Sequence, residues 1–163
     1  MLRTKIFTRT DLVEQVTAHQ KTGERIVFTN GCFDLLHIGH TRYLKEAKGL
    51  GDRLVVGLNS DDSVRQLAKG TDRPIVPADQ RAEVLAALAC VDYVTIFDEP
   101  DPLALIQALR PNILVKGGDW STDRIVGKDF VEAQGGSVRN IPLVPDISTT
   151  AIIQRILAQR PVK

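Results

Sequence analysis

Short apolar runs alternate with helix-forming stretches along most of this chain. Runs rich in Val, Ile, Leu and Phe predict strands at residues 25–29, 53–58, 91–97, 112–116 and near 137–142. Stretches with helical spacing of apolar residues predict helices at residues 10–21, 40–49, 102–109 and around 127–134, with two more that Asp79 and Ser148 cap. The run at 53–58 is almost continuously apolar, as in a strand covered on both faces. The alternation therefore predicts an α/β fold with a single doubly wound parallel sheet and helices on both faces.

Local residue types add detail to these elements. Thr10 is a predicted cap for the first helix, and the polar segment 59–78, which contains Gly70 and two prolines, predicts a long loop. The helix after Asp79 is expected to bury Val84, Leu85 and Leu88. The last helix is expected to carry its apolar side on Ile152, Ile153, Ile156 and Leu157.

Composition narrows the class of protein. The length of 163 residues suits one domain. The 21 Lys and Arg residues nearly balance the 20 Asp and Glu residues, so the sequence has no overall positive charge that would favour binding to nucleic acid or a membrane surface. Cys32 and Cys90 are too few for a disulfide scaffold, so we expect free thiols in a reducing compartment. The N-terminus lacks the apolar stretch of a signal peptide, and no run approaches the roughly 20 residues of a membrane span. The sequence predicts a cytoplasmic protein.

Polar and glycine residues follow three of the predicted strands. They lie at residues 30–40, 59–62 and 116–120. Ligands of doubly wound sheets bind beyond the carboxyl ends of the strands, where the strand order reverses. We therefore expect these three segments to form one site.

The segment 29–40 carries two of the chain's three histidines, His37 and His40, with Gly39 between them. At the start of a helix, free N–H groups and two imidazoles favour a phosphate, which Gly39 would allow to approach the backbone. Asp34 would cap the turn or orient a histidine. A metal site and simple helix capping remain alternatives from the residues alone, although no Cys or further His lies near enough to complete a structural zinc site.

The motif that runs from Gly31 through Phe33, Asp34, His37 and Gly39 to His40 resembles the signature of the cytidylyltransferase-like nucleotidyltransferases. A second landmark of that family is a Ser/Thr-rich helix start, which residues 148–150 supply. Together with residues 59–63, Arg73-Pro74 and residues 115–119, these motifs are similar to heptose 1-phosphate adenylyltransferases. The similarity covers residues 23–157 and implies a Rossmann-like nucleotidyltransferase domain over residues 1–163. Because no kinase half accompanies it, the chain resembles the stand-alone form.

This resemblance implies a reaction. AMP would pass from ATP to D-glycero-D-manno-heptose 1-phosphate by direct in-line attack. The products would be pyrophosphate and ADP-heptose, and the ADP-heptose would serve lipopolysaccharide synthesis. The alternative is a cytidylyltransferase for glycerol 3-phosphate or a similar polyol phosphate. In those enzymes an Arg commonly stands five residues before the Ser-Thr-Thr run, whereas this chain has Leu143. A nucleotide-binding module without turnover is a third hypothesis.

The resemblance also implies residue roles. The catalytic residues would be His37, His40 and Lys69. The nucleotide would contact Thr29, Asn30, Gly31, Phe33, Gly39, His40, Lys116, Gly118, Asp119, Ser148, Thr149 and Thr150. The acceptor would contact Cys32, Asp34, Asp61 and Arg73, while Arg81 would pair on its own helix and Trp120 has no assigned role.

Cofactor and partners follow from the same resemblance. Mg²⁺ is expected with ATP, without dedicated protein ligands, because the phosphates supply most of the oxygens. Neither nucleic acid nor a membrane is expected as a partner. A homodimer or higher homo-oligomer is expected, with the apolar run from Val91 to Phe97 as a possible contact face.

Overall fold

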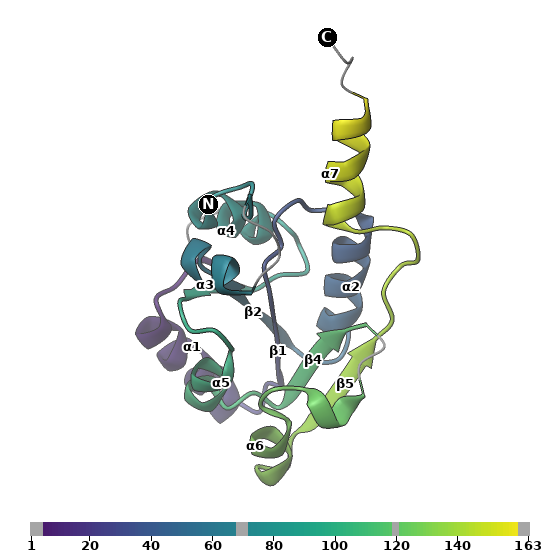
Figure 1. The fold of residues 1–163 in the computed structure, drawn as a ribbon. Coiled ribbons are helices and arrows are strands. Elements are labelled where there is room, and N and C mark those ends of the chain that lie inside the picture. The colour runs from purple at the N-terminus through teal and green to yellow at the C-terminus, as the bar shows by residue number, and fades with distance from the viewer. Residues whose placement is uncertain (1–4, 68–71, 119–120, 160–163) are drawn as a thin grey trace.

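The computed structural model describes residues 5–67, 72–118 and 121–159. Five parallel strands form one sheet in the order β3-β2-β1-β4-β5 (Figure 1). The strands are β1 (Ile26–Gly31), β2 (Arg53–Asn59), β3 (Tyr93–Phe97), β4 (Ile113–Gly117) and β5 (Ser137–Ile141). This architecture confirms the predicted doubly wound α/β fold.

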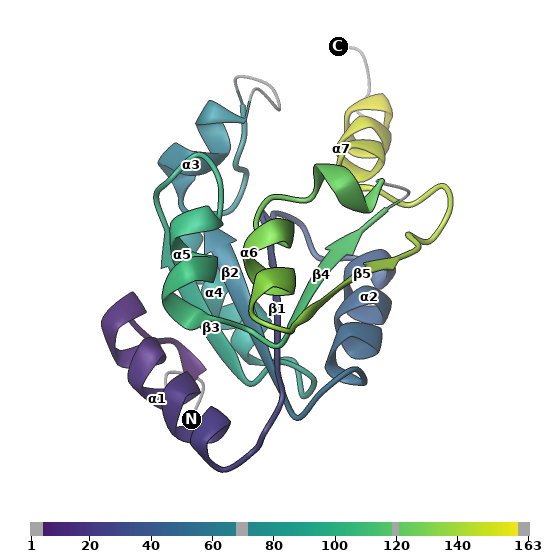
Figure 2. The same ribbon diagram turned by 90° about the horizontal axis from the view of Figure 1, so that it is seen from below.

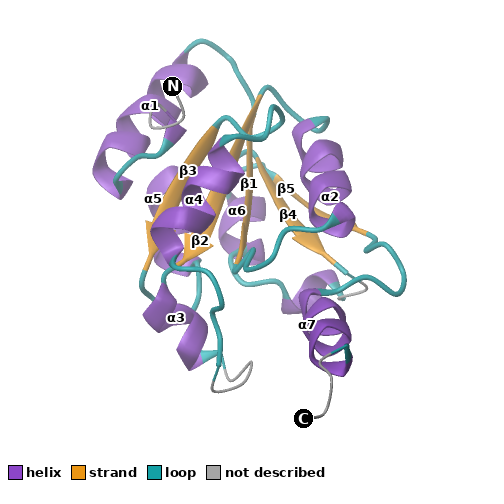
Figure 3. Ribbon diagram, turned by 90° about the horizontal axis from the view of Figure 1, so that it is seen from above, coloured by secondary structure: helices purple, strands orange, loops and turns teal. Residues whose placement is uncertain are grey.

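Helices cover both faces of the sheet, which Figures 2 and 3 show from opposite sides. On one face lie α2 (Ile38–Lys48) and α4 (Ala78–Ala86), and their Leu44 and Leu85 pack with Val56. On the other face lie α1 (Arg9–Lys21), α5 (Leu103–Leu109) and α6 (Lys128–Ala133), packed in a core that includes Val55 and Phe28. Side chains alternate along each strand, so Val55 and Val56 enter different cores.

The strand order reverses between β1 and β4. The chain goes from β1 to β2 and β3 on one side, then returns to place β4 and β5 on the other side. β1 is longer than predicted, because Asn30 and Gly31 continue the ladder opposite Gly57 and Leu58 instead of forming a turn. The ends of β1 and β4 therefore border the crevice where doubly wound sheets bind ligands.

The last helix, α7 (Thr149–Ala158), stands away from the sheet (Figure 1). Ser148 caps it as predicted, because its hydroxyl accepts a hydrogen bond from the Ala151 N–H at 3.0 Å. The predicted apolar side is largely uncovered, with Ile156 53% and Leu157 55% exposed. Only the first turn of α7 is near the site described below.

Four details of the prediction are wrong. Asp79 does not cap α4 but lies in its first turn, and Pro77 occupies the N-cap position. Thr8, not Thr10, caps α1, because the Thr8 hydroxyl accepts from the Asp11 N–H and donates to its carboxylate. The predicted loop at 59–78 contains a short helix, α3 (Asp61–Gln66), which Ser60 caps. In α4 Val84 is 49% exposed, because the buried stripe of that helix runs through Arg81, Ala82, Leu85 and Ala86.

The apolar run proposed as a contact face is mostly, but not wholly, interior. Val91 and Val94 are fully buried and Phe97 is 1% exposed, because helices pack on both faces of β3. Ile96 of the same run is 36% exposed, and β3 lies at the edge of the sheet, so the role of this run as a contact face stays a prediction. No helix among the described residues is long and apolar enough to cross a bilayer.

Candidate active site

His37 caps the helix that follows β1. Its Nδ1 accepts a hydrogen bond from the Gly39 N–H at 3.1 Å, which places the proton of the neutral ring on Nε2. A Cβ at Gly39 would lie 2.9 Å from the His37 ring, so the glycine makes room for this cap. Burial lowers the pKa of His37 below its usual 6.5. His37 is thus a neutral hydrogen-bond donor at a helix N-terminus.

His40 lies against His37. The two rings stack with centroids 3.9 Å apart and an interplanar angle of 24°, and the Phe33 ring lies 5.3 Å from His40. Phe33 adopts a left-handed φ of 44°, which is uncommon for a bulky side chain and is held here by the surrounding packing. Among the described residues no group of three or more His, Cys, Asp or Glu is placed to hold a metal. The histidine pair lies at the N-terminus of α2, a position that favours an anion.

A cavity of about 510 Å³, which we term the main cavity, opens beside these histidines. It gathers residues from the end of β1, the starts of α2 and α7, and the end of β4. The predicted site residues that line it are Asn30, Gly31, Cys32, Phe33, Asp34, His37, Gly39, His40, Arg73, Lys116, Ser148, Thr149 and Thr150. Gly117, within the predicted segment 116–120, also lines it, whereas the sequence did not assign the remaining lining residues to the site, Tyr43, Leu143, Val144 and Ile147.

Two helix N-termini meet at the main cavity. The Thr149 hydroxyl donates to the Leu35 carbonyl at 3.2 Å and so ties the start of α7 to the loop before α2. Each helix start carries unpaired N–H groups and a partial positive charge. Lys116 adds positive charge at the same cavity, which Arg73 also lines in an ion pair with Asp34. This combination favours an extended anion such as a polyphosphate.

Two predicted nucleotide-binding residues lie away from the main cavity. Thr29 is fully buried, and its hydroxyl shares a 2.5 Å hydrogen bond with Tyr43, whose hydroxyl also donates to the Val115 carbonyl. Burial, only partly offset by the Thr29 hydrogen bond, raises the pKa of Tyr43 to about 12. Gly118 is buried with φ of 107°, and its N–H donates to Ile141. Both residues support the framework of the site.

Asp34 holds a neighbouring loop. Its buried carboxylate accepts from the backbone N–H groups of Ile75 at 2.8 Å and Val76 at 2.9 Å, and from Arg73 Nε at 2.6 Å. Burial by itself raises the pKa of Asp34, but the two backbone donors and Arg73 outweigh it and leave that pKa below its usual value. Asp34 therefore anchors residues 73–76 at the cavity and does not orient a histidine.

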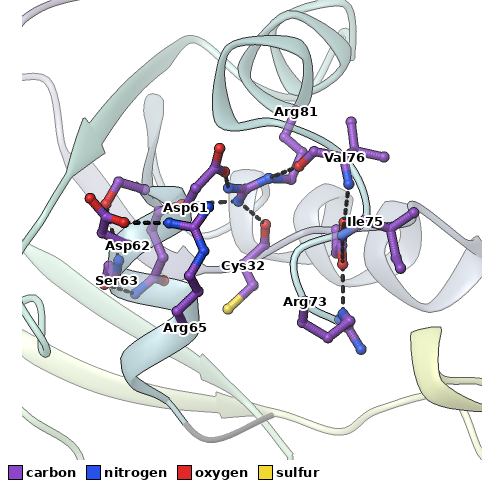
Figure 4. A network of polar contacts seen from close by, with 12 residues as sticks. Cys32, Asp61, Asp62, Ser63, Arg65, Arg73, Ile75, Val76 and Arg81 are labelled. Carbon is purple, nitrogen blue, oxygen red and sulfur yellow. Dashed lines mark hydrogen bonds and ion pairs between the residues drawn. The ribbon is translucent and has the colours of Figure 1, made fainter. Parts of the chain in front are cut away.

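Arg81 joins three chain segments (Figure 4). Its guanidinium is 1% exposed and donates to the carbonyls of Cys32 at 2.6 Å, Asn59 at 2.9 Å and Val76 at 2.8 Å. It also pairs with Asp61 of α3 at 2.7 Å, so the predicted pairing within its own helix is wrong. Asp61 lies outside the main cavity. Nothing in the sequence pattern marks Arg81 as buried, because its carbonyl partners come from distant segments.

Three residues singled out from the sequence, Lys69, Asp119 and Trp120, lie outside the described residues. Their roles stay predictions.

The chain resembles known proteins over most of its length. A family model described as cytidylyltransferase-like matches residues 28–155. The chain is 56% identical over 153 residues to the bifunctional protein HldE of Syntrophotalea carbinolica, and 57% over 141 residues to that of Geotalea uraniireducens. These alignments cover 94% and 86% of the chain but only 31% and 29% of the relatives' own length.

Among solved structures, the lipopolysaccharide core biosynthesis protein from Thermoplasma volcanium matches with a TM-score of 0.62 and 31% identity. This match covers 75% of the chain and 98% of that structure. It extends the similarity from the sequence to the fold.

Proposed function

Because this chain belongs to the cytidylyltransferase-like family, we propose that it transfers AMP from ATP to D-glycero-D-manno-heptose 1-phosphate, releasing ADP-heptose and pyrophosphate. The observation that carries the proposal is the meeting of two helix N-termini and the His37 Nε2–H donor at one cavity. Such a site supplies the positioning and charge stabilisation on which phosphoryl transfer depends.

The choice of heptose phosphate rests on similarity at two levels. The motifs at residues 29–40, 59–63, 115–119 and 148–150 resemble heptose 1-phosphate adenylyltransferases. The HldE relatives extend the likeness over most of the chain, and the name of the Thermoplasma volcanium protein is compatible with a role in lipopolysaccharide synthesis. The cytidylyltransferase alternative is weaker, because Leu143 lines the main cavity as an apolar side chain where those enzymes commonly carry an Arg.

Each group in the main cavity has a proposed task. His37 and His40 contact the phosphates of ATP and stabilise the charge that develops as the bond to pyrophosphate breaks. Ser148, Thr149 and Thr150 bind the β- and γ-phosphates with hydroxyl and backbone N–H groups. Arg73, held by Asp34, adds a fixed charge. The roles of Lys69 and Asp119 are proposed on the resemblance alone.

Mg²⁺ is proposed as the cofactor. The described residues offer no acidic cluster for it, so the metal would bind on the triphosphate and reduce its charge.

Two further proposals concern setting and assembly. We propose a cytoplasmic enzyme, in keeping with the free thiols of Cys32 and Cys90 and with ATP as substrate. We also propose a homo-oligomer, on the resemblance alone. Light scattering of the purified protein tests this proposal, and a monomeric mass at micromolar concentration would reject it.

Pyrophosphate release across four nucleoside triphosphates and several sugar and polyol phosphates tests the proposed reaction. ATP with D-glycero-D-manno-heptose 1-phosphate should give the highest kcat/KM. Faster turnover of CTP with glycerol 3-phosphate would favour the alternative. Binding of ATP without turnover of any acceptor would favour a nucleotide-binding module.

A further inference from the structure

The pairing between β1 and β4 is short, and it ends where Phe28 lies beside Leu114. Each of these strands stays paired with its other neighbour for longer. β1 pairs with β2 as far as Gly31, and β4 pairs with β5 as far as Gly117. Because Gly31 and Gly117 both line the main cavity, the two halves of the sheet separate at the wall of that cavity.

Tyr43 of α2 joins the two strands at the first residues beyond this ladder. Its hydroxyl donates to the Val115 carbonyl of β4 at 3.2 Å, which uses its single proton. The Thr29 hydroxyl of β1 is then the donor in the 2.5 Å hydrogen bond between the two side chains. This arrangement, which we term the tyrosine bridge, stands where a further residue pair would otherwise join β1 to β4.

The tyrosine bridge lies beneath the wall of the main cavity. Thr29 and Val115 are fully buried, and neither lines the cavity. The Tyr43 ring does line it and lies against Gly117, where a Cβ would come 3.2 Å from the ring carbon Cε2. Because the partners of the hydroxyl belong to the protein interior, the hydroxyl can act on a bound ligand only through the strands that it joins.

We propose that Tyr43 is a positioning residue for the transfer, an inference that rests on the proposed function. The tyrosine bridge fixes the separation of the two strand ends, residues 30–31 and 116–117, which line opposite sides of the place where the sheet divides. Tyr43 also follows His40 by three residues on α2, so the two side chains are neighbours on one helix face. The bridge therefore holds the histidine pair of α2 at a set distance from Lys116 of β4.

The size of the expected effect follows from the kind of catalysis. Phosphoryl transfer depends on positioning and charge stabilisation, and a displacement of the reacting groups by about 1 Å can cost roughly 10²-fold in rate. Loss of the Tyr43 hydroxyl leaves the ring and the strand ladders in place, so we expect a smaller displacement. The loss should therefore appear in kcat and should be about tenfold.

Tyr43→Phe tests the proposal, because it removes the hydroxyl and keeps the ring that lines the main cavity. In the pyrophosphate assay kcat should fall about tenfold, while the KM for ATP changes less than about threefold. Tyr93→Phe is the matched control. Tyr93 is the other Tyr of the chain, its hydroxyl lies 2.6 Å from His19 Nε2, and it does not line the main cavity, so this variant should retain kcat. Equal kcat for the two variants, or a change in the KM for ATP alone, would overturn the proposal.

Thr29→Val removes the other hydroxyl of the tyrosine bridge and keeps the branched shape of the side chain. It should lower kcat about as much as Tyr43→Phe. The double variant should lower kcat less than about twofold further, because both changes act through one bridge. Losses that multiply to roughly 100-fold in the double variant would show independent effects and would overturn the proposal.

NMR separates this inference from the proposed reaction, because it needs no turnover. Residual dipolar couplings of the backbone N–H groups report the orientation of the strand ends. The couplings of residues 30–31 and 116–117 should change in Tyr43→Phe and stay as in wild type in Tyr93→Phe. If they do so while wild-type protein releases no pyrophosphate from ATP, the proposed reaction fails and the role of the bridge stands. Unchanged couplings in Tyr43→Phe would overturn that role whether or not the wild type turns over.

Discussion

His37 has two tasks at the start of α2, and one substitution separates them. Asn is also a favoured helix cap, so His37→Asn should keep α2 capped and leave the free energy of unfolding within about 1 kcal/mol. It removes the Nε2–H donor, so kcat should fall by roughly 10²–10³-fold in the pyrophosphate assay. His19→Asn is the control, because His19 lies on α1 beside Tyr93 and Glu24, and it should retain kcat. Equal rates for both variants would remove His37 from the reaction.

The lowered pKa of His37 predicts a pH dependence of stability in the free protein. The unfolded chain takes up a proton at this residue near pH 6.5, whereas the folded chain does so only at lower pH. Between these two values the unfolded state binds more protons, so the free energy of unfolding decreases as the pH falls below 6.5. Urea denaturation between pH 7.5 and 5, at about half-unit steps, should show a smaller decrease for His37→Asn than for wild type. Parallel curves would contradict the burial of this imidazole.

At the scale of elements, Arg81 and Arg65 provide a matched comparison of two Arg–Asp pairs. Arg81→Met leaves the carbonyls of Cys32, Asn59 and Val76 without their donor and should cost about 3–5 kcal/mol of unfolding free energy. Arg65 is exposed in its pair with Asp62, so Arg65→Met should cost less than about 0.5 kcal/mol. Urea denaturation at pH 7 measures both. Similar small losses would show that Arg81 does not hold the three segments together.

The elements that sequence alone identified are those whose signal is local. The strands and α7 follow from apolar runs and from Ser148, and the motif at 29–40 falls at the predicted strand end. The helix α3 was missed because a short helix in a polar segment buries little, essentially Ser63 and Val64. Val84 was misplaced because Arg81 occupies the buried stripe, which a hydrophobicity pattern counts as surface.

The site shows the same division between local and long-range signals. His37, Gly39 and Ser148 were identified from spacing, since their roles depend on neighbours in the sequence. The binding of Asp34 to Ile75 and Val76, and of Thr29 to Tyr43, depends on folding that brings distant segments together. Lys116 was assigned to the nucleotide, but its position beside Asn30 at the main cavity follows only from the pairing of β4 with β1.

For the whole molecule, the arrangement of charge determines how a metal enters the reaction. Three acidic residues that follow strands are already engaged in ion pairs, Asp34 with Arg73, Asp61 with Arg81 and Glu99 with Arg9. Beyond the Asp34–Arg73 pair, the main cavity presents Lys116 and two helix N-termini, which repel a free cation. Mg²⁺ should therefore bind only together with the triphosphate.

Thermal unfolding tests this order of binding. Mg²⁺ alone should leave Tm unchanged, whereas Mg²⁺ with α,β-methylene-ATP at about 100 times its Kd should add roughly 2.7 kcal/mol of stability by mass action. EDTA should abolish pyrophosphate release, and excess Mg²⁺ should restore it. Ca²⁺ with the analogue is a control for charge alone, because it accepts a looser coordination than Mg²⁺. An increase in Tm with Mg²⁺ in the absence of nucleotide would reveal a protein-held metal and would contradict the charge arrangement described for the free cavity.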